Sequence, residues 1–221
     1  MTGIEAVGRA VTECSRCPRL VAWRAEAART PPARFAGEPY WARPVPGFGD
    51  PAARIYVLGL ATAAHGGNRT GRAFTGNPTA AWLVRSMHRA GLASQPTSER
   101  RGDGLRLLGA WMGSAVRCAP PGNRPTPAER DTCLPFLTAE VAALPRLRVL
   151  VCLGAFAWTT ALHWAGARPR PRFAHGAEHR LESGLVLLAS YHPSQQNTNT
   201  GLLTEPMLDA VLHRARTLAE P

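Results

Sequence analysis

Residues 59 to 77, GLATAAHGGNRTGRAFTGN, place five glycines among histidine, arginine and asparagine side chains directly after an apolar run. Glycines there let backbone N–H groups approach a ligand closely, as in phosphate-binding loops and dinucleotide fingerprints. Their spacing fits neither motif, because no G-x-x-x-x-G-K-[ST] occurs and no compact G-x-G-x-x-G opens a helix. The segment is therefore predicted to hold a ligand of another kind.

Four of the five cysteines have spacings that suit a metal or a cluster. Cys14 and Cys17 form a C-x-x-C pair, and Cys118 and Cys133 lie far downstream. Four thiolates suit tetrahedral zinc or an iron–sulfur cluster, and spacing alone does not choose between these or exclude a chain without metal. Cys152, inside VLVCLG, is predicted to be a core residue.

The charge balance favours a polyanionic partner. The chain has 26 basic and 15 acidic residues and a net charge of +11, which suggests nucleic acid or an anionic membrane surface. Every basic residue is arginine, so codon bias in a GC-rich genome is an alternative explanation. The absence of lysine excludes a lysine Schiff base as a catalytic intermediate.

The sequence predicts neither a secretory signal nor a membrane-spanning run. Its first residues include acidic side chains and lack a long apolar core, and no uninterrupted apolar stretch approaches 18 residues. We therefore expect a cytoplasmic protein, where cysteines serve metals or redox chemistry more often than disulfides. A length of 221 residues suits one domain.

Apolar runs alternate with helix signals along the chain. Strands are predicted at 54–60, 111–117, 148–153 and 185–191, and helices after Asn77-Pro78, after Thr126, over 155–166 and from Thr204 to about 218. This order predicts an α/β domain with a central four-stranded parallel sheet and helices on both faces. Polar segments that follow three strands, at 59–77, 118–127 and 192–201, should converge on one crevice at the carboxyl ends of the strands.

Three of these segments together resemble a known family. GLATAAHGGNRTGRAFTGN, AVRCAPPGNRPTPAERDTC and SYHPSQQNTNTG are similar to the uracil-DNA glycosylase superfamily, and most closely to its family 5, the type B enzymes. The resemblance implies a single domain over 1–221 whose N-terminal segment, about 1–50, helps to hold a 4Fe-4S cluster. The implied ligands are Cys14, Cys17, Cys118 and Cys133.

The resemblance also implies a reaction, hydrolysis of the N-glycosidic bond of a base flipped out of DNA. Phe74 matches the stacking position, Asn123 is assigned to the polar edge of uracil, and His192 to stabilising the anionic base that leaves. The simpler roles for these residues are core packing, an ordinary turn and a backbone cap. The remaining residues expected to line the base pocket are Gly59, Ala63 and Ala64.

The sequence departs from the type B pattern at three positions. Thr62 stands where proline is common, Asn77 where aspartate is common, and Leu202 where arginine is often found. Asn77 can orient a water but cannot take a proton, and it is also a predicted helix N-cap; His65 is the other candidate to position water. The chain is thus interpreted as an active glycosylase or, alternatively, as a weakened or silent binder of DNA lesions. A nucleotide-binding or zinc-dependent hydrolase is a third hypothesis, which lacks a phosphate or deaminase motif.

The expected partner is DNA containing uracil or other deaminated bases such as hypoxanthine. Predicted DNA contacts come from the crevice loops: Arg69, Arg72, Arg117, Arg124, Ser194 and Gln195. Because there is no lysine, a monofunctional enzyme that leaves an abasic site is expected. The protein is further expected to be a monomer associated with the nucleoid.

Overall fold

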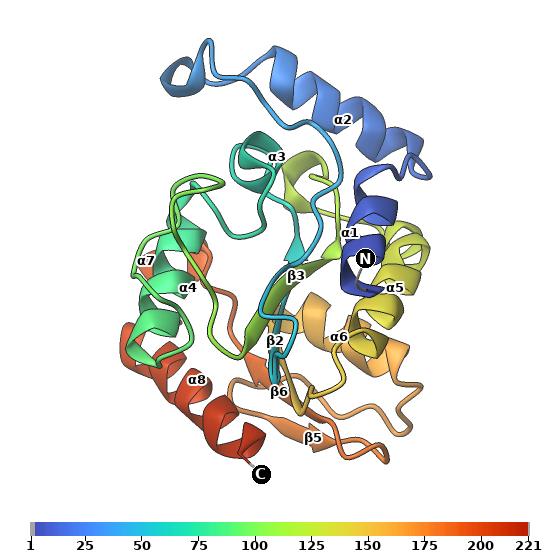
Figure 1. Cartoon of the computed structure of the whole chain (residues 1–221), viewed down its shortest axis with the longest axis vertical. Coiled ribbons are helices and arrows are strands. Elements are labelled where there is room, and N and C mark those ends of the chain that lie inside the picture. The colour runs from blue at the N-terminus through green and yellow to red at the C-terminus, as the bar shows by residue number, and fades with distance from the viewer. Residues whose placement is uncertain (1–2, 221) are drawn as a thin grey trace.

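The computed structural model describes residues 3–220 as a sheet covered by helices on both faces (Figure 1). The strands of this part of the chain are β1 Phe48–Gly49, β2 Ile55–Ala61, β3 Ala110–Val116, β4 Val149–Leu153, β5 Glu178–Arg180 and β6 Val186–Ser190. Their order is β1-β3-β2-β4-β6-β5. The four central strands are parallel, as the sequence predicts.

Two short antiparallel strands extend this sheet beyond the predicted four. β1 pairs with β3 and β5 pairs with β6 at the two edges. They have two and three residues; both residues of β1 are partly buried, whereas two of the three in β5 are exposed. Strands this short show no readable apolar alternation, so nothing in the sequence marks them.

The helices cover both faces of the sheet, and residues 13–45 form an N-terminal arm. They are α1 Gly3–Thr12, α2 Pro18–Arg29, η1 Ala33–Phe35, α3 Gly67–Thr70, α4 Pro78–Arg89, η2 Pro121–Asn123, α5 Pro127–Ala142, α6 Gly154–Trp164, α7 Gln195–Asn199 and α8 Glu205–Ala219. The predicted starts of two helices are confirmed: Asn77 caps α4 through its side chain, and Thr126 and Glu129 form a capping box on α5.

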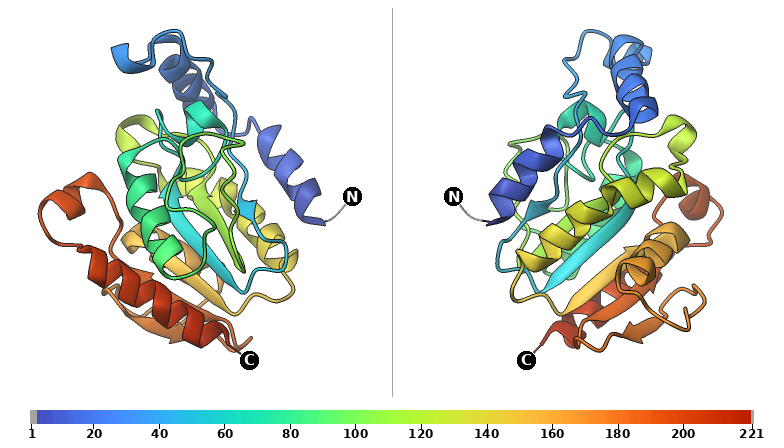
Figure 2. Two further views of the ribbon diagram at one scale, coloured as in Figure 1. Left: turned by 60° about the vertical axis from the view of Figure 1, so that its left-hand side comes forward. Right: turned by 90° about the vertical axis from the view of Figure 1, so that its right-hand side faces the viewer.

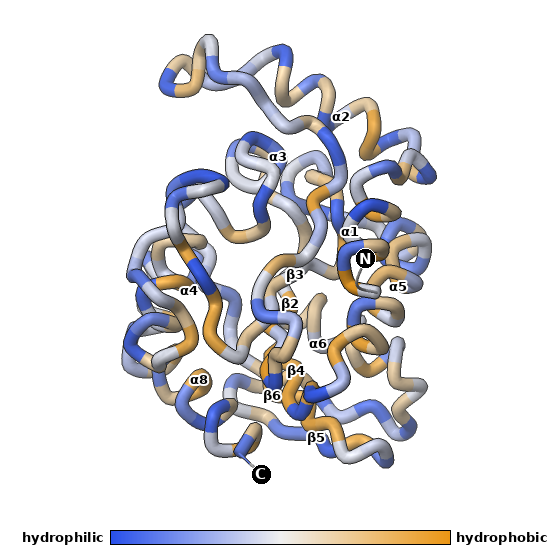
Figure 3. Tube along the Cα trace, in the orientation of Figure 1, coloured by the Kyte–Doolittle hydropathy of each residue, from blue (hydrophilic) through white to orange (hydrophobic). Residues whose placement is uncertain are grey.

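Both faces of the sheet are apolar because the central strands are covered on each side. Ile55 and Val57 pack in one core with α4 and α8, whereas Tyr56 and Leu58 pack in the other with α5 and α6. Figure 2 shows these two layers from the sides, and Figure 3 shows orange, apolar residues gathered on the inner strands. No helix within residues 3–220 is both long and apolar enough to cross a bilayer.

A candidate active site at the carboxyl ends of the strands

The three polar loops predicted to meet do line one cavity, of about 600 Å³. It lies where β2, β3 and β6 end, so each loop contributes a wall. Its lining includes Thr62, Ala63, Phe74, Asn77, Asn123, Arg124, His192, Ser194, Gln195 and Asn197. The convergence follows from the parallel order of the central strands, which brings their carboxyl ends to one edge.

Phe74 lies over the end of β2, on one wall of this cavity. A Cβ atom at Gly59 would overlap the Phe74 ring, so glycine is required there for the ring to lie against the strand. Phe74 itself has φ 48°, a left-handed conformation that is uncommon for a residue with a side chain. Part of the ring packs on the core beside α4 and part lines the cavity. Both readings of Phe74, core packing and stacking, therefore have a structural basis.

His192 follows β6 and lines the same cavity. Gly154, the residue after β4, lies against it with φ 86°, and a Cβ there would come within 3.1 Å of the His192 Cβ. Asn197 of α7 donates a hydrogen bond to the His192 carbonyl oxygen at 2.9 Å, which ties the loop to its helix. Burial lowers the pKa of His192 to about 4, so the imidazole is neutral at neutral pH.

The two asparagines face the cavity from different loops. Asn123 ends η2 in a left-handed conformation, with φ 56°, and is exposed. Asn77 accepts the Ala80 N–H at 2.8 Å through Oδ1, which is the N-cap bond of α4. Its Nδ2 lies over Gly66, where any Cβ would overlap it. The Asn77 amide is thus hydrogen-bonded at Oδ1 and packed against Gly66 at Nδ2 while it lines the cavity.

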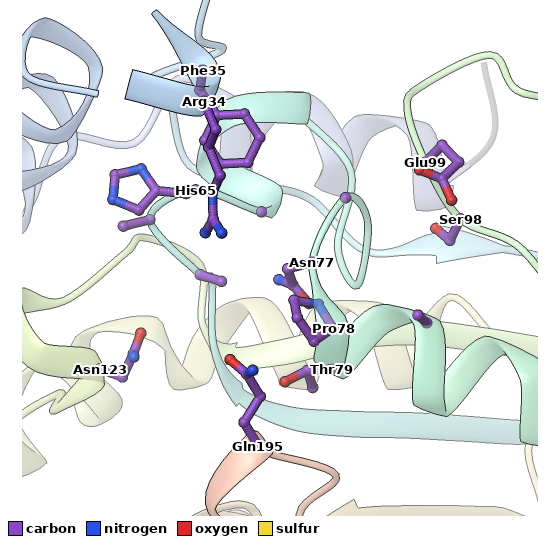
Figure 4. Close-up of a pocket in the computed structure, with 15 residues that line it drawn as sticks. Arg34, Phe35, His65, Asn77, Pro78, Thr79, Ser98, Glu99, Asn123 and Gln195 are labelled. Carbon is purple, nitrogen blue, oxygen red and sulfur yellow. The ribbon is translucent and has the colours of Figure 1, made fainter. Parts of the chain in front are cut away.

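A second chamber of about 530 Å³ adjoins the first and shares its Ala63, Asn77, Asn123 and Gln195 lining (Figure 4). The predicted residues Ala64 and His65 line this chamber as well. Its lining also includes residues from outside the predicted site, among them Arg34 and Phe35 of the N-terminal arm and Ser98 and Glu99 of the loop before β3. In the sequence, segment 29–53 is rich in proline and glycine and is interpreted as an irregular connector, so its contribution to this chamber was not predicted.

His65 belongs to this second chamber and not to the cavity around His192. The Tyr40 hydroxyl and His65 Nδ1 are 2.9 Å apart, and the Phe35 ring lies 6.3 Å from the imidazole centre. Burial, followed by the charges of Arg34 and Arg69, lowers the pKa of His65. A neutral imidazole held by Tyr40 fits the positioning of a water.

Arg69 and Arg72 hold the glycine-rich loop together. Arg69 donates to the carbonyl oxygens of His65 and Gly76, at 3.0 Å each, and pairs with Glu38 at 2.6 Å. Arg72 is 8% exposed and forms a two-pronged pair with Asp103 at 2.7 and 2.8 Å. The prediction that Arg72 contacts DNA is therefore wrong, because its guanidinium is buried in the ion pair with Asp103.

Arg117 is buried as well, which contradicts its predicted contact with DNA. Its guanidinium and the Glu140 carboxylate are both 1% exposed and meet at 2.8 and 3.0 Å. The Tyr56 hydroxyl also donates to Glu140. Thr62, where the resemblance leads us to expect proline, is buried and donates through its hydroxyl to the Arg117 carbonyl at 2.9 Å. The unusual Thr62 thus joins the cavity wall to β3.

We expect Arg117→Met to lower the free energy of unfolding by about 3–5 kcal/mol, because Glu140 is then a buried charge without its cation. Urea unfolding measures the change. The matched control is the double variant Arg117→Met with Glu140→Leu, which removes both charges and should recover much of the loss. Equal stability of the single variant and the wild type would contradict a buried ion pair.

The remaining predicted DNA contacts are accessible. Arg124 is exposed and lines the cavity, and Ser194 and Gln195 lie at the start of α7 on its rim. Leu202, just beyond α7, is 48% exposed, an unusual state for a large apolar side chain in this protein. The cavity rim therefore offers the Arg124 cation and several amide side chains to a ligand.

The four predicted cysteines line one small cavity below the N-terminal arm. Arg24 donates to the Cys118 sulfur at 3.2 Å and Arg16 to the Cys14 sulfur at 3.4 Å. Burial raises the pKa of Cys118 to about 11 and also raises that of Cys133. Within residues 3–220, no three Cys, His, Asp or Glu side chains have the spacing to hold a single metal ion. Cys152 is buried in the core under α6, as predicted.

Known proteins are similar in sequence to this chain over nearly its whole length. The chain is 52% identical over 216 residues to the type-5 uracil-DNA glycosylase of Thermus thermophilus, covering 97% of this chain and 98% of the relative. It is 51% identical over 212 residues to that of Mycobacterium bovis, covering 95% and 79%. It is 46% identical over 205 residues to that of Pyrobaculum aerophilum, covering 93% and 88%. Residues 46–216 match the family described as the Uracil DNA glycosylase superfamily.

The chain belongs to the uracil DNA glycosylase superfamily.

This membership confirms the family that the three sequence motifs indicate, together with its α/β fold. The part that matches the uracil DNA glycosylase superfamily contains all three crevice loops, Cys118 and Cys133. It begins after Cys14, Cys17 and Arg34. The N-terminal arm thus lies outside the part that matches the family model, although the Thermus thermophilus relative covers 97% of the chain.

Proposed function

We propose that the protein is a uracil-DNA glycosylase, which flips uracil out of DNA and hydrolyses its N-glycosidic bond. One observation carries the proposal: a cavity at the carboxyl ends of the strands is lined by Phe74, Asn123 and a neutral His192 from three loops. An aromatic face, an amide edge and an N–H donor are what a flipped pyrimidine needs. The relatives' names favour this active enzyme over a silent lesion binder.

His192 is the residue we assign to the leaving base. Cleavage leaves negative charge on uracil, and a donor already aimed at that charge stabilises the transition state more than the ground state. The low pKa of His192 keeps the ring neutral, so it donates a hydrogen bond and does not deliver a proton from an imidazolium. The Asn123 amide, with one donor and one acceptor group, is assigned to the opposite polar edge of the base.

Asn77 and His65 are assigned to the attacking water. Asn77 lines both chambers, and His65 lines the second. No carboxylate lines the first cavity among the described residues, while Glu99 lines the second. The positive charge on the sugar therefore develops beside a positioned water, without a general base at position 77. This arrangement suits a largely dissociative cleavage. Since the chain has no lysine, we propose a product with an abasic site and an intact strand.

The cysteine cavity fits a 4Fe-4S cluster held by Cys14, Cys17, Cys118 and Cys133. Four thiols from three segments surround it, and Arg16 and Arg24 supply positive charge that favours thiolates. When bound, the cluster would cross-link the N-terminal arm to β3 and α5.

We expect Cys17→Ser to abolish the broad visible absorbance of the purified protein and to lower its melting temperature, because one ligand of the cross-link is lost. Absorbance spectra and iron analysis measure this. Cys152→Ala is the matched control, since Cys152 is buried away from the cavity and its loss should leave the iron content unchanged. A colourless wild-type protein with one zinc per chain would rule out the cluster.

The activity is tested by incubating the protein with uracil-containing duplex DNA, followed by alkali to cleave abasic sites. Excision of uracil supports the proposal, and binding without excision would show a silent lesion binder. A panel of duplexes with hypoxanthine, xanthine and thymine tests the wider range of deaminated bases that the alanine-lined loop permits. Strand cleavage before alkali would contradict a monofunctional enzyme. We further propose that the protein acts as a cytoplasmic, nucleoid-associated monomer, consistent with its net charge of +11.

A further inference from the structure

The crevice has few cations left to meet DNA phosphates. Arg72 and Arg117 are buried in ion pairs, and Arg69, 13% exposed, is bound by Glu38 and two carbonyl oxygens. Arg124 is exposed on the rim of the first cavity. A DNA-binding protein neutralises several phosphates, so any further exposed cation beside the crevice is a candidate contact.

Arg34 is such a cation. It lies in η1 on the N-terminal arm, is exposed, and lines the second chamber, into which its guanidinium extends in Figure 4. No carboxylate forms an ion pair with it among residues 3–220. His65 lines the same chamber, and the charge of Arg34 contributes, after burial, to the lowered pKa of His65. Glu99 stands on the far wall, so the chamber has a cation on one side and an anion on the other.

The arm that carries Arg34 is fixed to the glycine-rich loop at several points. Trp41 and Ala42 donate backbone hydrogen bonds to the carbonyl oxygens of Arg69 and Asn68, both at 3.0 Å. The Arg69 guanidinium also lies over the Phe35 ring, 4.1 Å from its centre. A side chain on such a support is held in place before a ligand arrives, which lowers the ordering cost of binding.

We propose that the second chamber is a phosphate subsite in which Arg34 binds the DNA backbone beside the flipped nucleotide. The chamber adjoins the base cavity through Asn77 and Ala63, so a strand whose base enters the first passes the second. The negative charge of Glu99 repels the phosphate and so restricts the phosphate to the Arg34 side of the chamber. This assignment rests on the proposed function, since the ligand is the strand that carries the excised base.

The test is the salt dependence of binding to a short duplex that contains a tetrahydrofuran abasic-site analogue. Arg34→Gln is compared with Arg146→Gln, which removes the same charge from an exposed arginine in the loop before β4, at the other end of the strands. Affinities are measured between about 50 and 200 mM salt, where each lost phosphate contact reduces the slope of log K against log[salt] by about 0.9. Single-turnover excision of uracil is measured on the same variants.

Arg34→Gln should reduce the slope by about 0.9 and raise the half-saturating enzyme concentration, with little change in the maximal excision rate. Arg146→Gln and Arg34→Lys should keep the wild-type slope, and Glu99→Gln should tighten binding. An unchanged slope in Arg34→Gln, with a wild-type enzyme that excises uracil, would overturn the subsite alone. A wild-type protein that neither excises uracil nor prefers the lesion duplex would overturn the proposed function itself.

Discussion

Replacing His192 by alanine is expected to slow uracil excision about 10²–10³-fold, the usual cost of removing one donor aimed at a developing anion. The side chain lines the cavity at the end of β6 and is neutral, with a pKa of about 4. In the proposed mechanism its N–H therefore stabilises the leaving uracil without a prior protonation. Single-turnover assays with uracil duplex measure the chemical step directly.

The control for this variant is His213→Ala, an exposed histidine of α8. It should excise uracil at the wild-type rate, and His192→Ala should still bind an abasic-site duplex. The pH profile gives an independent check, because a pKa lowered to about 4 leaves His192 uncharged as the pH falls from 8 to 5. A rate that changes over that interval with a pKa near 6.5, and loses the change in His192→Ala, would show that imidazolium is the active form.

Replacing Asn77 by aspartate is expected to accelerate excision by at least tenfold. A carboxylate at that position can take a proton from the attacking water and face the positive sugar, and general acid–base catalysis contributes about 10²–10⁴-fold. Aspartate is also a good N-cap, so the bond to the Ala80 N–H is kept. The variant therefore changes the chemistry of the site while the local fold stays the same.

Single-turnover rates of wild type, Asn77→Asp and Asn77→Ala separate the chemical role from the structural one. The alanine variant should lose about 1 kcal/mol of stability with the cap, as well as the amide that orients water. The aspartate variant should gain a decline in rate at acid pH that the wild type lacks, since its carboxylate must be ionised to act. A rate for Asn77→Asp equal to the wild type would mean that water activation is not limiting in this enzyme.

Local patterns in the sequence were enough to predict the scaffold. The four central strands, the caps at Asn77 and Thr126 and the order of the crevice loops all follow from short-range apolar runs and capping residues. The parallel order then dictates that the loops meet at one edge of the sheet. The edge strands β1 and β5 escaped prediction because two or three residues carry no period.

Only the tertiary structure decides which arginines are buried in ion pairs and which stay exposed. In the sequence Arg34, Arg69, Arg72 and Arg117 differ little, and three of them lie in or beside the loops that form the site. Folding brings Asp103 to Arg72 and Glu140 to Arg117, and it brings the connector with Arg34 over the glycine-rich loop. A residue type and its neighbours determine which bonds a side chain can make, but long-range packing decides which partner it meets and whether water reaches it.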